Sequence, residues 1–290
     1  MPDPDKLLKT LYKAAEAVRW TAGRKGRFLQ AVGATEVIAV GDLHGHVGNF
    51  QTIYQAAELA KNPKRHLVLQ EVVHGKFLYP GGGDKSHQLL DLFAALKCQF
   101  PSQVHLLLGN HELAQWTNRA VLKDDRDLNV AFSEGVMTAY GVEKGRAIYD
   151  AYVRLFGVLP LAIRTENRVF ISHSLPREKA LARFELRHLE TDAFPPEDLT
   201  VGGSVFELLW GRDTREENCN AFLAKVDADW LVSGHIACEA GFARPNTRQL
   251  IVDCCSSPAA YAFFSAIRPL TAEDFAGCVR MIGGSSNGAQ

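Results

Sequence analysis

Short apolar runs alternate with helix-forming segments between residues 36 and 109, and this alternation constrains the fold more than any other feature of the chain. The apolar runs lie at 36–41, 66–71 and 104–109, and the two segments between them space apolar residues as a helix does. Successive β-α-β units form parallel strands with right-handed crossovers, and ligands of such sheets bind beyond the carboxyl ends of the strands. The pattern predicts an α/β fold whose functional site lies at that edge.

Strand-like runs return in the second half of the chain, which predicts a second sheet packed on the first. They lie at residues 159–165, 168–172, 229–234, 248–254 and 260–267. A hydrophobic content of 47% among 290 residues is enough for a substantial core. We expect an N-terminal helical extension over residues 1–34, a main domain over 35–270, and a C-terminal segment over 271–290 that ends in a flexible tail.

The charge and the apolar runs limit the partners of the chain. A net charge of -1 argues against nucleic acid and anionic membranes as partners, because a nearly neutral chain is not strongly attracted to either. No apolar run reaches the ~18 residues of a membrane span, and the first twenty residues lack the pattern of a secretory leader. The six cysteines show no CxxC spacing, so we expect reduced thiols in a cytoplasmic protein.

Residues of the kinds that bind metal ions follow four of the apolar runs. They are Asp42 with His44, Asn110 with His111, His173, and His235. Each alone is more often an ordinary turn or a structural histidine, but four such events at strand ends together indicate a metal site. Carboxylate, amide and imidazole ligands suit manganese, iron or zinc.

These residues belong to motifs, namely Gly-Asp-Leu-His-Gly at 41–45, Gly-Asn-His-Glu at 109–112 and the two later histidines. In this order the chain resembles the phosphoprotein-phosphatase branch of the calcineurin-like metallophosphoesterases over about residues 35–267. The resemblance implies the metallophosphatase fold, in which two mixed β-sheets pack as a sandwich flanked by helices in four layers (αββα). It also implies a phosphoester hydrolase with two divalent metal ions, which would be Mn, Fe or Zn.

The resemblance implies a role for each of these side chains. Asp42 and His44 would hold the first ion, Asn110, His173 and His235 would hold the second, and His111 would be the general acid. Two such ions, roughly 3.5–4 Å apart, lower the pKa of a bound water and clamp the phosphoryl oxygens. The expected reaction is direct attack of the resulting hydroxide on a phosphomonoester, while the general acid protonates the leaving oxygen.

The second motif departs from the pattern of the family. Where the family has Gly-Asp followed closely by Asp-Arg-Gly, residues 70–76 read Gln-Glu-Val-Val-His-Gly-Lys. Glu71 is the only carboxylate at this strand end, so it is the candidate bridge between the two ions. Its extra methylene moves the carboxylate outward by about 1.5 Å relative to an aspartate.

The Asp-Arg pair of the family has two possible counterparts in this chain. The sequence leaves both of them open, and it also leaves open that the pair has no replacement. Counting strictly along the second motif gives His74 and Gly75, so that His74 would act beside the substrate. Counting from the next helix gives Asp84 and Lys85 and requires an insertion that could wall the substrate cleft. Asp84 would then orient His111 in catalysis, and Lys85 would bind phosphate without the forked geometry of arginine.

A second phosphate-binding arginine is expected between the two late histidines. The stretch Leu-Leu-Trp-Gly-Arg-Asp-Thr-Arg-Glu at 208–216 makes Arg212 the best candidate for catalysis and substrate binding, with Arg215 in reserve. Gly-Asn-His-Glu together with Leu-Pro-Leu-Ala at 159–162 favours a protein serine/threonine phosphatase acting on a phosphorylated substrate. The alternatives are a hydrolase of small phosphorylated metabolites or dinucleotide polyphosphates, and a metal-binding module that has lost turnover.

Overall fold

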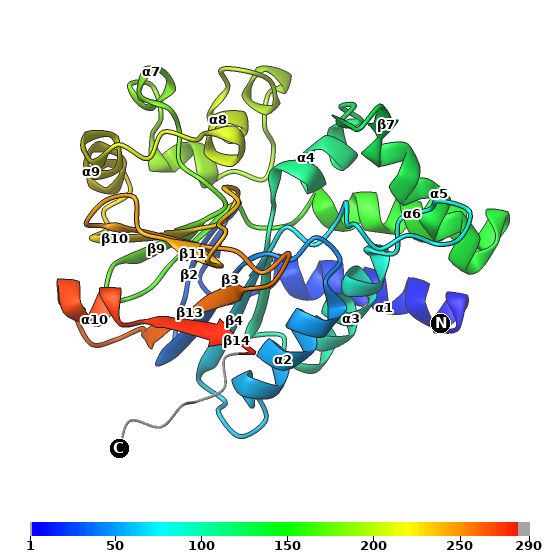
Figure 1. Cartoon of the computed structure of the whole chain (residues 1–290), viewed down its shortest axis with the longest axis horizontal. Coiled ribbons are helices and arrows are strands. Elements are labelled where there is room, and N and C mark those ends of the chain that lie inside the picture. Colours follow the sequence, from blue (N-terminus) through cyan, green and yellow to red (C-terminus); the bar gives the residue numbers. More distant parts are fainter. Residues whose placement is uncertain (1, 284–290) are drawn as a thin grey trace.

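The computed structural model describes residues 2–283, and its centre is a pair of mixed β-sheets (Figure 1). The five-stranded sheet has the order β14-β13-β3-β4-β5. Its strands are β3 (Glu36–Asp42), β4 (Arg65–Gln70), β5 (Val104–Leu107), β13 (Ala259–Ser265) and β14 (Val279–Ile282). As the alternating pattern predicts, β3, β4 and β5 run parallel, whereas β13 and β14 are antiparallel to their neighbours.

The seven-stranded sheet has the order β1-β2-β8-β9-β10-β12-β11. Its strands are β1 (Arg24–Lys25), β2 (Phe28–Gln30), β8 (Ala162–Arg164), β9 (Val169–Ser172), β10 (Trp230–Ser233), β11 (Phe242–Ala243) and β12 (Gln249–Val252). Its centre is also parallel, because β10 pairs in parallel with both β9 and β12. The two sheets meet where the main-chain amide of Cys254 donates to the carbonyl oxygen of Asp42 at 3.0 Å.

The side chains of the central strands alternate between two hydrophobic clusters, because successive residues of a strand point to opposite faces. In β3, Val37 and Ala39 belong to the cluster that both sheets share, whereas Ile38 and Val40 join the cluster that includes the helices. The described residues thus form four layers, with helices outside a sandwich of two sheets, and the predicted fold class is confirmed.

The helices lie on both sides of this sandwich (Figure 1). They are α1 (Pro4–Arg19), α2 (Val47–Ala57), α3 (His87–Gln99), α4 (Asn110–Thr117), α5 (Leu128–Tyr140), α6 (Val142–Phe156), α7 (Glu178–Leu181), α8 (Ser204–Trp210), α9 (Glu216–Lys225) and α10 (Ala272–Ala276), with 3-10 turns η1 (Leu186–Leu189) and η2 (Pro196–Leu199). Among residues 2–283, none of the helices has both the length and the apolar character that crossing a membrane requires.

The sequence pattern does not predict three short strands at the flanks of the main domain. β2 pairs with β8, β1 pairs with β2, and β14 pairs with β13, so both flanks contribute strands to the sheets. A further hairpin, β6 (Leu122–Lys123) and β7 (Arg126–Asp127), precedes α5. The domain boundaries at 35 and 270 stay a prediction, and residues 284–290 of the predicted flexible tail lie outside the described residues.

Lys97 on α3 is a buried lysine at the junction of α1 and the sheet. Its ammonium donates to Oγ1 of Thr21 at 2.9 Å and to the carbonyl oxygen of Pro101 at 2.6 Å. Burial, with a smaller effect from the charge of Arg24, lowers the pKa of Lys97 to about 7. The folded protein therefore releases this proton at a lower pH than the unfolded chain does.

This titration predicts a pH-dependent contribution to stability. Between pH about 7 and about 10.4, the unfolded chain keeps a proton that folded Lys97 has lost, so the free energy of unfolding should rise with pH. Lys97→Met removes the titration, and wild type should gain about 1 kcal/mol per pH unit over this variant within the window. Urea denaturation across the window measures it, with exposed Lys64→Met as the matched control. Equal pH slopes for wild type and Lys97→Met would contradict the assignment.

Candidate metal centre

The ends of strands from both sheets supply the candidate ligands. Asp42 is the last residue of β3, Glu71 directly follows β4, and Asn110 begins α4 after β5. His173 directly follows β9, and His235 lies two residues beyond the end of β10. All five lie at carboxyl ends of strands, where the alternating pattern predicts a site.

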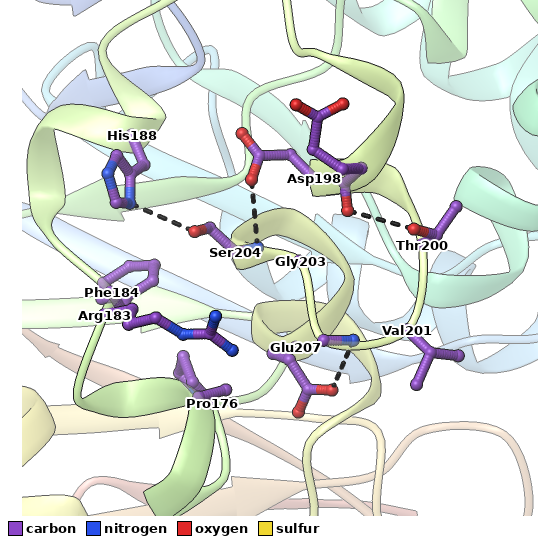
Figure 2. A pocket seen from close by; sticks show the side chains of 13 residues that line it. Pro176, Arg183, Phe184, His188, Asp198, Thr200, Val201, Gly203, Ser204 and Glu207 are labelled. Carbon is purple, nitrogen blue, oxygen red and sulfur yellow. Dashed lines mark hydrogen bonds between the residues drawn. The ribbon is translucent and has the colours of Figure 1, made fainter.

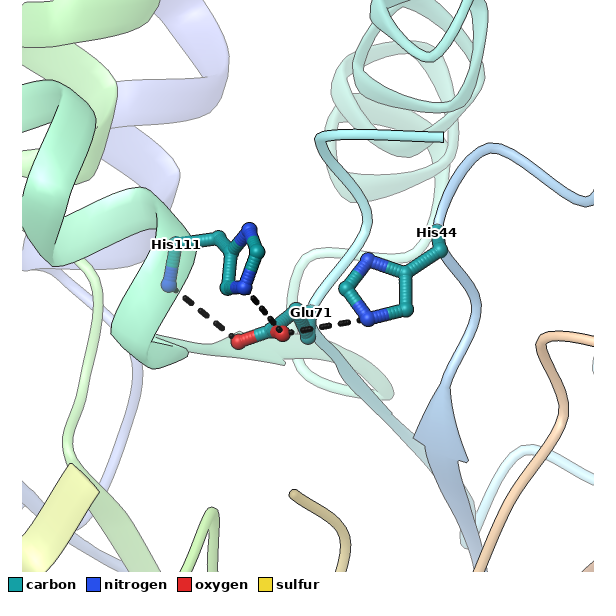
Figure 3. A group of neighbouring side chains, drawn as sticks. All are labelled: His44, Glu71 and His111. Carbon is teal, nitrogen blue, oxygen red and sulfur yellow. Dashed lines mark hydrogen bonds and ion pairs between the residues drawn. The ribbon is translucent and has the colours of Figure 1, made fainter. Parts of the chain in front are cut away.

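Glu71 lies between His44 and His111 (Figure 3) and also contacts His173. Its Oε1 lies 3.3 Å from Nε2 of His44 and 3.7 Å from Nε2 of His111. Its Oε2 lies 3.0 Å from Nε2 of His173 and accepts a hydrogen bond from the main-chain amide of His111 at 3.2 Å. Two sets of three side chains bring their ligand atoms within 4.8 Å of one another, and Glu71 belongs to both sets. The other members are His44 with His111 and Asp42 with His173.

Asn110 and Asp42 complete the group on the side of the late histidines. Oδ1 of Asn110 lies 2.7 Å from Nε2 of His173 and 2.8 Å from Nδ1 of His235. The carboxylate of Asp42 accepts from the main-chain amide of His235 at 3.0 and 3.1 Å. It also lies 3.7 Å from Nδ1 of His173 and 3.9 Å from Nε2 of His44. The six residues that the resemblance implies as metal ligands therefore form one contiguous cluster.

The backbone is strained at several of these positions. The φ angles of His44, Glu71, His74 and His235 are 40°, 34°, 60° and 67°, in the left-handed region that non-glycine residues seldom adopt. Such a conformation costs on the order of 1–3 kcal/mol for each residue and persists only where the surrounding structure enforces it. This concentration of strain is typical of a functional site.

In the described part of the chain, two imidazole nitrogens of the cluster lack a hydrogen-bond partner. Within residues 2–283, Nδ1 of His173 and Nε2 of His235 are buried and make no hydrogen bond. Buried polar atoms are nearly always satisfied in folded proteins, so such an atom requires an explanation. A metal ion would provide one, because neutral imidazole nitrogens are common metal ligands.

Two glycines leave room for the carboxylates. A Cβ added at Gly109 would lie 2.4 Å from Oε2 of Glu71, and a Cβ added at Gly234 would lie 2.3 Å from Oδ1 of Asp42. Any other residue at either position would displace a carboxylate from the cluster. Together with the mixed set of carboxylate, imidazole and amide donors, this shape fits the divalent ions that the sequence predicts.

The electrostatics of the cluster also fit a cation. Burial raises the pKa of Asp42 to about 6 against the opposing effect of His173, and the charge of Glu71 adds to the rise. Burial alone would lower the pKa of His173, yet the charges of Glu71 and Asp42 raise it to about 9. Burial alone would also raise the pKa of Glu71, yet His111 and His173 hold it well below its usual value. Two buried carboxylates thus require positive charge beside them, which a divalent ion supplies directly.

The family model of the calcineurin-like phosphoesterases matches residues 35–239, which include this whole cluster. The chain belongs to the calcineurin-like phosphoesterase family. The predicted resemblance to the phosphoprotein-phosphatase branch of this family is confirmed.

Curated relatives of this phosphoesterase are protein phosphatases. This chain is 26% identical over 219 residues to serine/threonine-protein phosphatase 5 of Homo sapiens, a match that covers 69% of this chain and 39% of that protein. It is 25% identical over 217 residues to serine/threonine-protein phosphatase BSL2 of Arabidopsis thaliana, a match that covers 73% of this chain and 19% of that protein. The matched region thus spans less than half the length of these relatives.

Solved structures with the same fold include two phosphatases. A protein serine/threonine phosphatase from Saccharomyces cerevisiae with similarity to human PP5 has a TM-score of 0.71 at 15% identity, covering 99% of this chain and 92% of that one. A cold-active protein-tyrosine phosphatase from a Shewanella species has a TM-score of 0.60 at 14% identity, covering 87% and 80%. At these identities the likeness shows the fold of the phosphoesterase.

The structure distinguishes between the two registers of the second motif. Nδ1 of His74 lies 2.7 Å from Nδ1 of His111, the position at which the sequence predicts an acid. The carboxylate of Asp84 instead accepts hydrogen bonds from the main-chain amide of Gly75 at 3.1 Å and from the amide and hydroxyl of Ser86 at 2.8 and 2.7 Å. Of the two alternatives, the structure brings His74 into contact with His111, whereas Asp84 accepts hydrogen bonds within its own loop.

Glu112 is a site residue that the sequence analysis does not single out. Its buried carboxylate accepts from the main-chain amides of Val72 and Val73 at 2.8 and 3.2 Å and from that of Gly109 at 3.2 Å. Burial raises the pKa of Glu112 to about 7, and the charge of Glu71 adds to the rise. Glu112 ties the second motif to the start of α4. The capping position of glutamate in Gly-Asn-His-Glu is the sequence signal that could have indicated this role.

The predicted phosphate-binding residues lie apart from one another. Nζ of Lys85 lies 5.1 Å from the ring centroid of Tyr79, and Lys85 does not line the cavity beside the metal centre. Arg212 is exposed just beyond α8, and its charge contributes, after burial and His173, to lowering the pKa of His235 to about 3. The reserve candidate, Arg215, is paired with Asp213 and Glu178, so its charge is already compensated.

Two cavities differ in their relation to the metal centre. One, of about 340 Å³, is lined by His44, His74 and His111 and lies directly at the centre. The other, of about 420 Å³, lies between α7 and α8 (Figure 2) and contains none of the candidate ligands. Arg183 and His188 line that second cavity. The first cavity is the place where a substrate would reach the cluster.

The position of Glu71 in both ligand sets predicts that its charge is needed for metal binding. Glu71→Gln keeps the shape of the side chain but removes the charge, so the apparent Kd for Mn²⁺ should rise at least about tenfold. Metal content after dialysis against defined Mn²⁺ concentrations, measured by mass spectrometry, checks this. Exposed Glu134→Gln is the matched control and should bind as wild type does. Equal metal content in both variants would exclude Glu71 as a shared ligand.

Proposed function

We propose that this phosphoesterase hydrolyses phosphomonoesters with two divalent metal ions, in the manner of a protein serine/threonine phosphatase. The observation that carries the proposal is the buried carboxylate of Glu71, which belongs to two ligand sets and lies beside His111. The family membership supports the reaction class, and the serine/threonine phosphatases among its relatives support the substrate. The identity of the metal ions, Mn, Fe or Zn, and a cytoplasmic location stay predictions from the sequence.

Following the resemblance, we divide the ligand cluster between two ions and leave His111 free to act as the acid. Asp42 and His44 would hold one ion, Asn110, His173 and His235 would hold the other, and Glu71 would contact both. When bound, such ions lower the pKa of a coordinated water and neutralise charge on the phosphoryl oxygens. The strained strand-end loops fix the ligands in advance, which favours precise positioning of the substrate.

His111 is placed to donate a proton from Nε2, and its neighbours determine which nitrogen does so. Nε2 of His74 lies 2.9 Å from Oε1 of Gln115, while Nε2 of Gln115 donates to the hydroxyl of Tyr149 at 2.6 Å. With the Gln115 amide in this orientation, neutral His74 carries its hydrogen on Nε2 and accepts at Nδ1 from His111. His111 therefore keeps a hydrogen on Nδ1, so it can donate to the leaving oxygen only after a second proton binds at Nε2. Burial lowers the pKa of His111 to about 3 against the opposing charge of Glu71, so this imidazolium is a strong acid once it forms.

A second candidate function, a metal-binding module without turnover, is favoured by one specific observation. His74, an imidazole, contacts His111 where the family has an aspartate. The next residue is Gly75, where the family has an arginine. Both replacements remove charge that supports phosphoryl transfer. The turnover of the metal-loaded protein distinguishes a weak enzyme from a module without turnover.

Loss of the general acid should reduce turnover while metal binding persists. We expect His111→Ala to lower kcat by about 100- to 10,000-fold, the usual contribution of general acid catalysis. Hydrolysis of p-nitrophenyl phosphate and of a phosphoserine peptide with Mn²⁺, Fe²⁺ or Zn²⁺ measures this, alongside metal content. His188→Ala, which changes a histidine of the α7–α8 cavity, is the control. Metal-loaded wild type that is no faster than His111→Ala on either substrate would support the module without turnover.

The contact between the two histidines predicts a separate effect at His74. His74→Ala should lower kcat by about 10- to 100-fold with little change in KM, because the substrate still binds but the general acid is less well oriented. His74→Asp should recover most of the loss, since a carboxylate can accept the same hydrogen bond. Steady-state kinetics of both variants measure this split. A rise in KM for His74→Ala without a fall in kcat would assign His74 to substrate binding, which the sequence also allows.

A further inference from the structure

Gly75 occupies the position where the family has its phosphate-binding arginine, and the structure excludes a side chain there. A Cβ added at Gly75 would lie 2.4 Å from the carbonyl oxygen of His44 and 3.3 Å from Cα of Gly45. These are main-chain atoms of the loop that carries a metal ligand, so they cannot move without displacing that ligand. Positive charge for the phosphoryl group must therefore come from other residues.

Two lysines line the cavity at the metal centre. Its volume is about 340 Å³, and Lys76 and Lys123 line it together with His44, His74 and His111. Lys76 directly follows Gly75, whereas Lys123 lies on the β6–β7 hairpin, so the two lysines reach the cavity from separate segments. Both lysines are exposed, and within residues 2–283 neither forms an ion pair with a carboxylate.

The ammonium of Lys76 lies over the ring of its neighbour Phe77, which contacts the loop that carries the ligand His44. Its Nζ lies 5.7 Å from the ring centroid of Phe77, and that ring is in edge contact with the imidazole of His46 at 5.3 Å between centroids. An ammonium that is not paired with a carboxylate attracts a phosphate group, because no nearby negative charge offsets its field.

We propose that Lys76 and Lys123 hold the nonbridging oxygens of the substrate phosphoryl group from two segments of the cavity wall, replacing the arginine that Gly75 excludes. This assignment rests on the proposed function. Each ammonium offers a compact charge with three hydrogen-bond donors, in place of one forked guanidinium. Lys85, the alternative from the sequence, lies over Tyr79 and outside this cavity.

The remaining wall of the cavity indicates the class of ester. It is lined by Val121, Leu122 and Leu128 on one side and by Cys255 and Ser256 on another, and Leu122 is 72% exposed. A volume of about 340 Å³ is near the lower end of ligand pockets, which span roughly 300–1,000 Å³. The cavity suits a phosphomonoester whose carbon chain next to the phosphate is short and partly apolar, such as a phosphorylated side chain.

Binding of inorganic phosphate to the Mn²⁺-loaded protein tests the lysine pair without requiring turnover. Lys76→Gln and Lys123→Gln should each weaken phosphate binding by about five- to tenfold, and the double variant by about 25- to 100-fold. Lys76→Arg and Lys123→Arg should keep most of the affinity. Isothermal titration calorimetry measures these constants, metal content confirms that each variant is loaded, and exposed Lys64→Gln is the matched control.

The outcomes separate this inference from the proposed function. If the double variant binds phosphate as tightly as wild type, or if Lys85→Gln weakens binding in its place, the lysine pair is not the phosphate site. Absence of phosphate binding by metal-loaded wild type also overturns it. If phosphate binding depends on the two lysines but wild type hydrolyses no phosphomonoester, the lysine pair stands and the proposed hydrolysis fails. If wild type hydrolyses phosphomonoesters and the lysine substitutions do not change phosphate binding, the proposed hydrolysis stands and the lysine pair fails.

Discussion

The buried carboxylate of Glu71 is the charge around which the rest of the site is organised. Burying an unpaired carboxylate costs several kcal/mol, and removing one partner of a buried pair typically costs about 3–5 kcal/mol. Here the compensation comes from imidazoles on three different segments and from the main-chain amide of His111. Gly109 leaves the space that the carboxylate occupies, and Glu112 holds the adjoining main chain. The strained loop of His44 is thus held against this one charge.

The strand pattern and the meeting of the candidate ligands at the strand ends could be predicted from the sequence, and the register of the second motif could not. The ligands follow from local rules, because each comes directly after an apolar run and parallel strands end at a common edge. The register depends on contacts between distant residues. His74 meets His111 across 37 positions, whereas Asp84 satisfies amides of its own loop, and residue spacing alone does not distinguish the two arrangements.

The remaining differences have the same physical origin. Short edge strands such as β1 and β14 contain two to four residues, too few to show a periodic pattern, and they form because a neighbouring strand is available. Lys123 is separated from the second motif by about fifty residues of sequence, and only the β6–β7 hairpin brings it to the cavity. A charged turn on the surface and a substrate-binding hairpin have the same local sequence signals, so folding alone decides between them.

The departures from the family in the second motif belong together. With Gly75 packed against the main chain of His44 and Gly45, an arginine at this position would push the His44 loop away from Glu71. A guanidinium there would also add positive charge beside His74 and His111, whose contact requires that at least one of the two rings stay neutral. Moving the positive charge outward to Lys76 and Lys123 avoids both conflicts. Restoring the arginine alone would therefore disturb the metal ligands before it could help to bind phosphate.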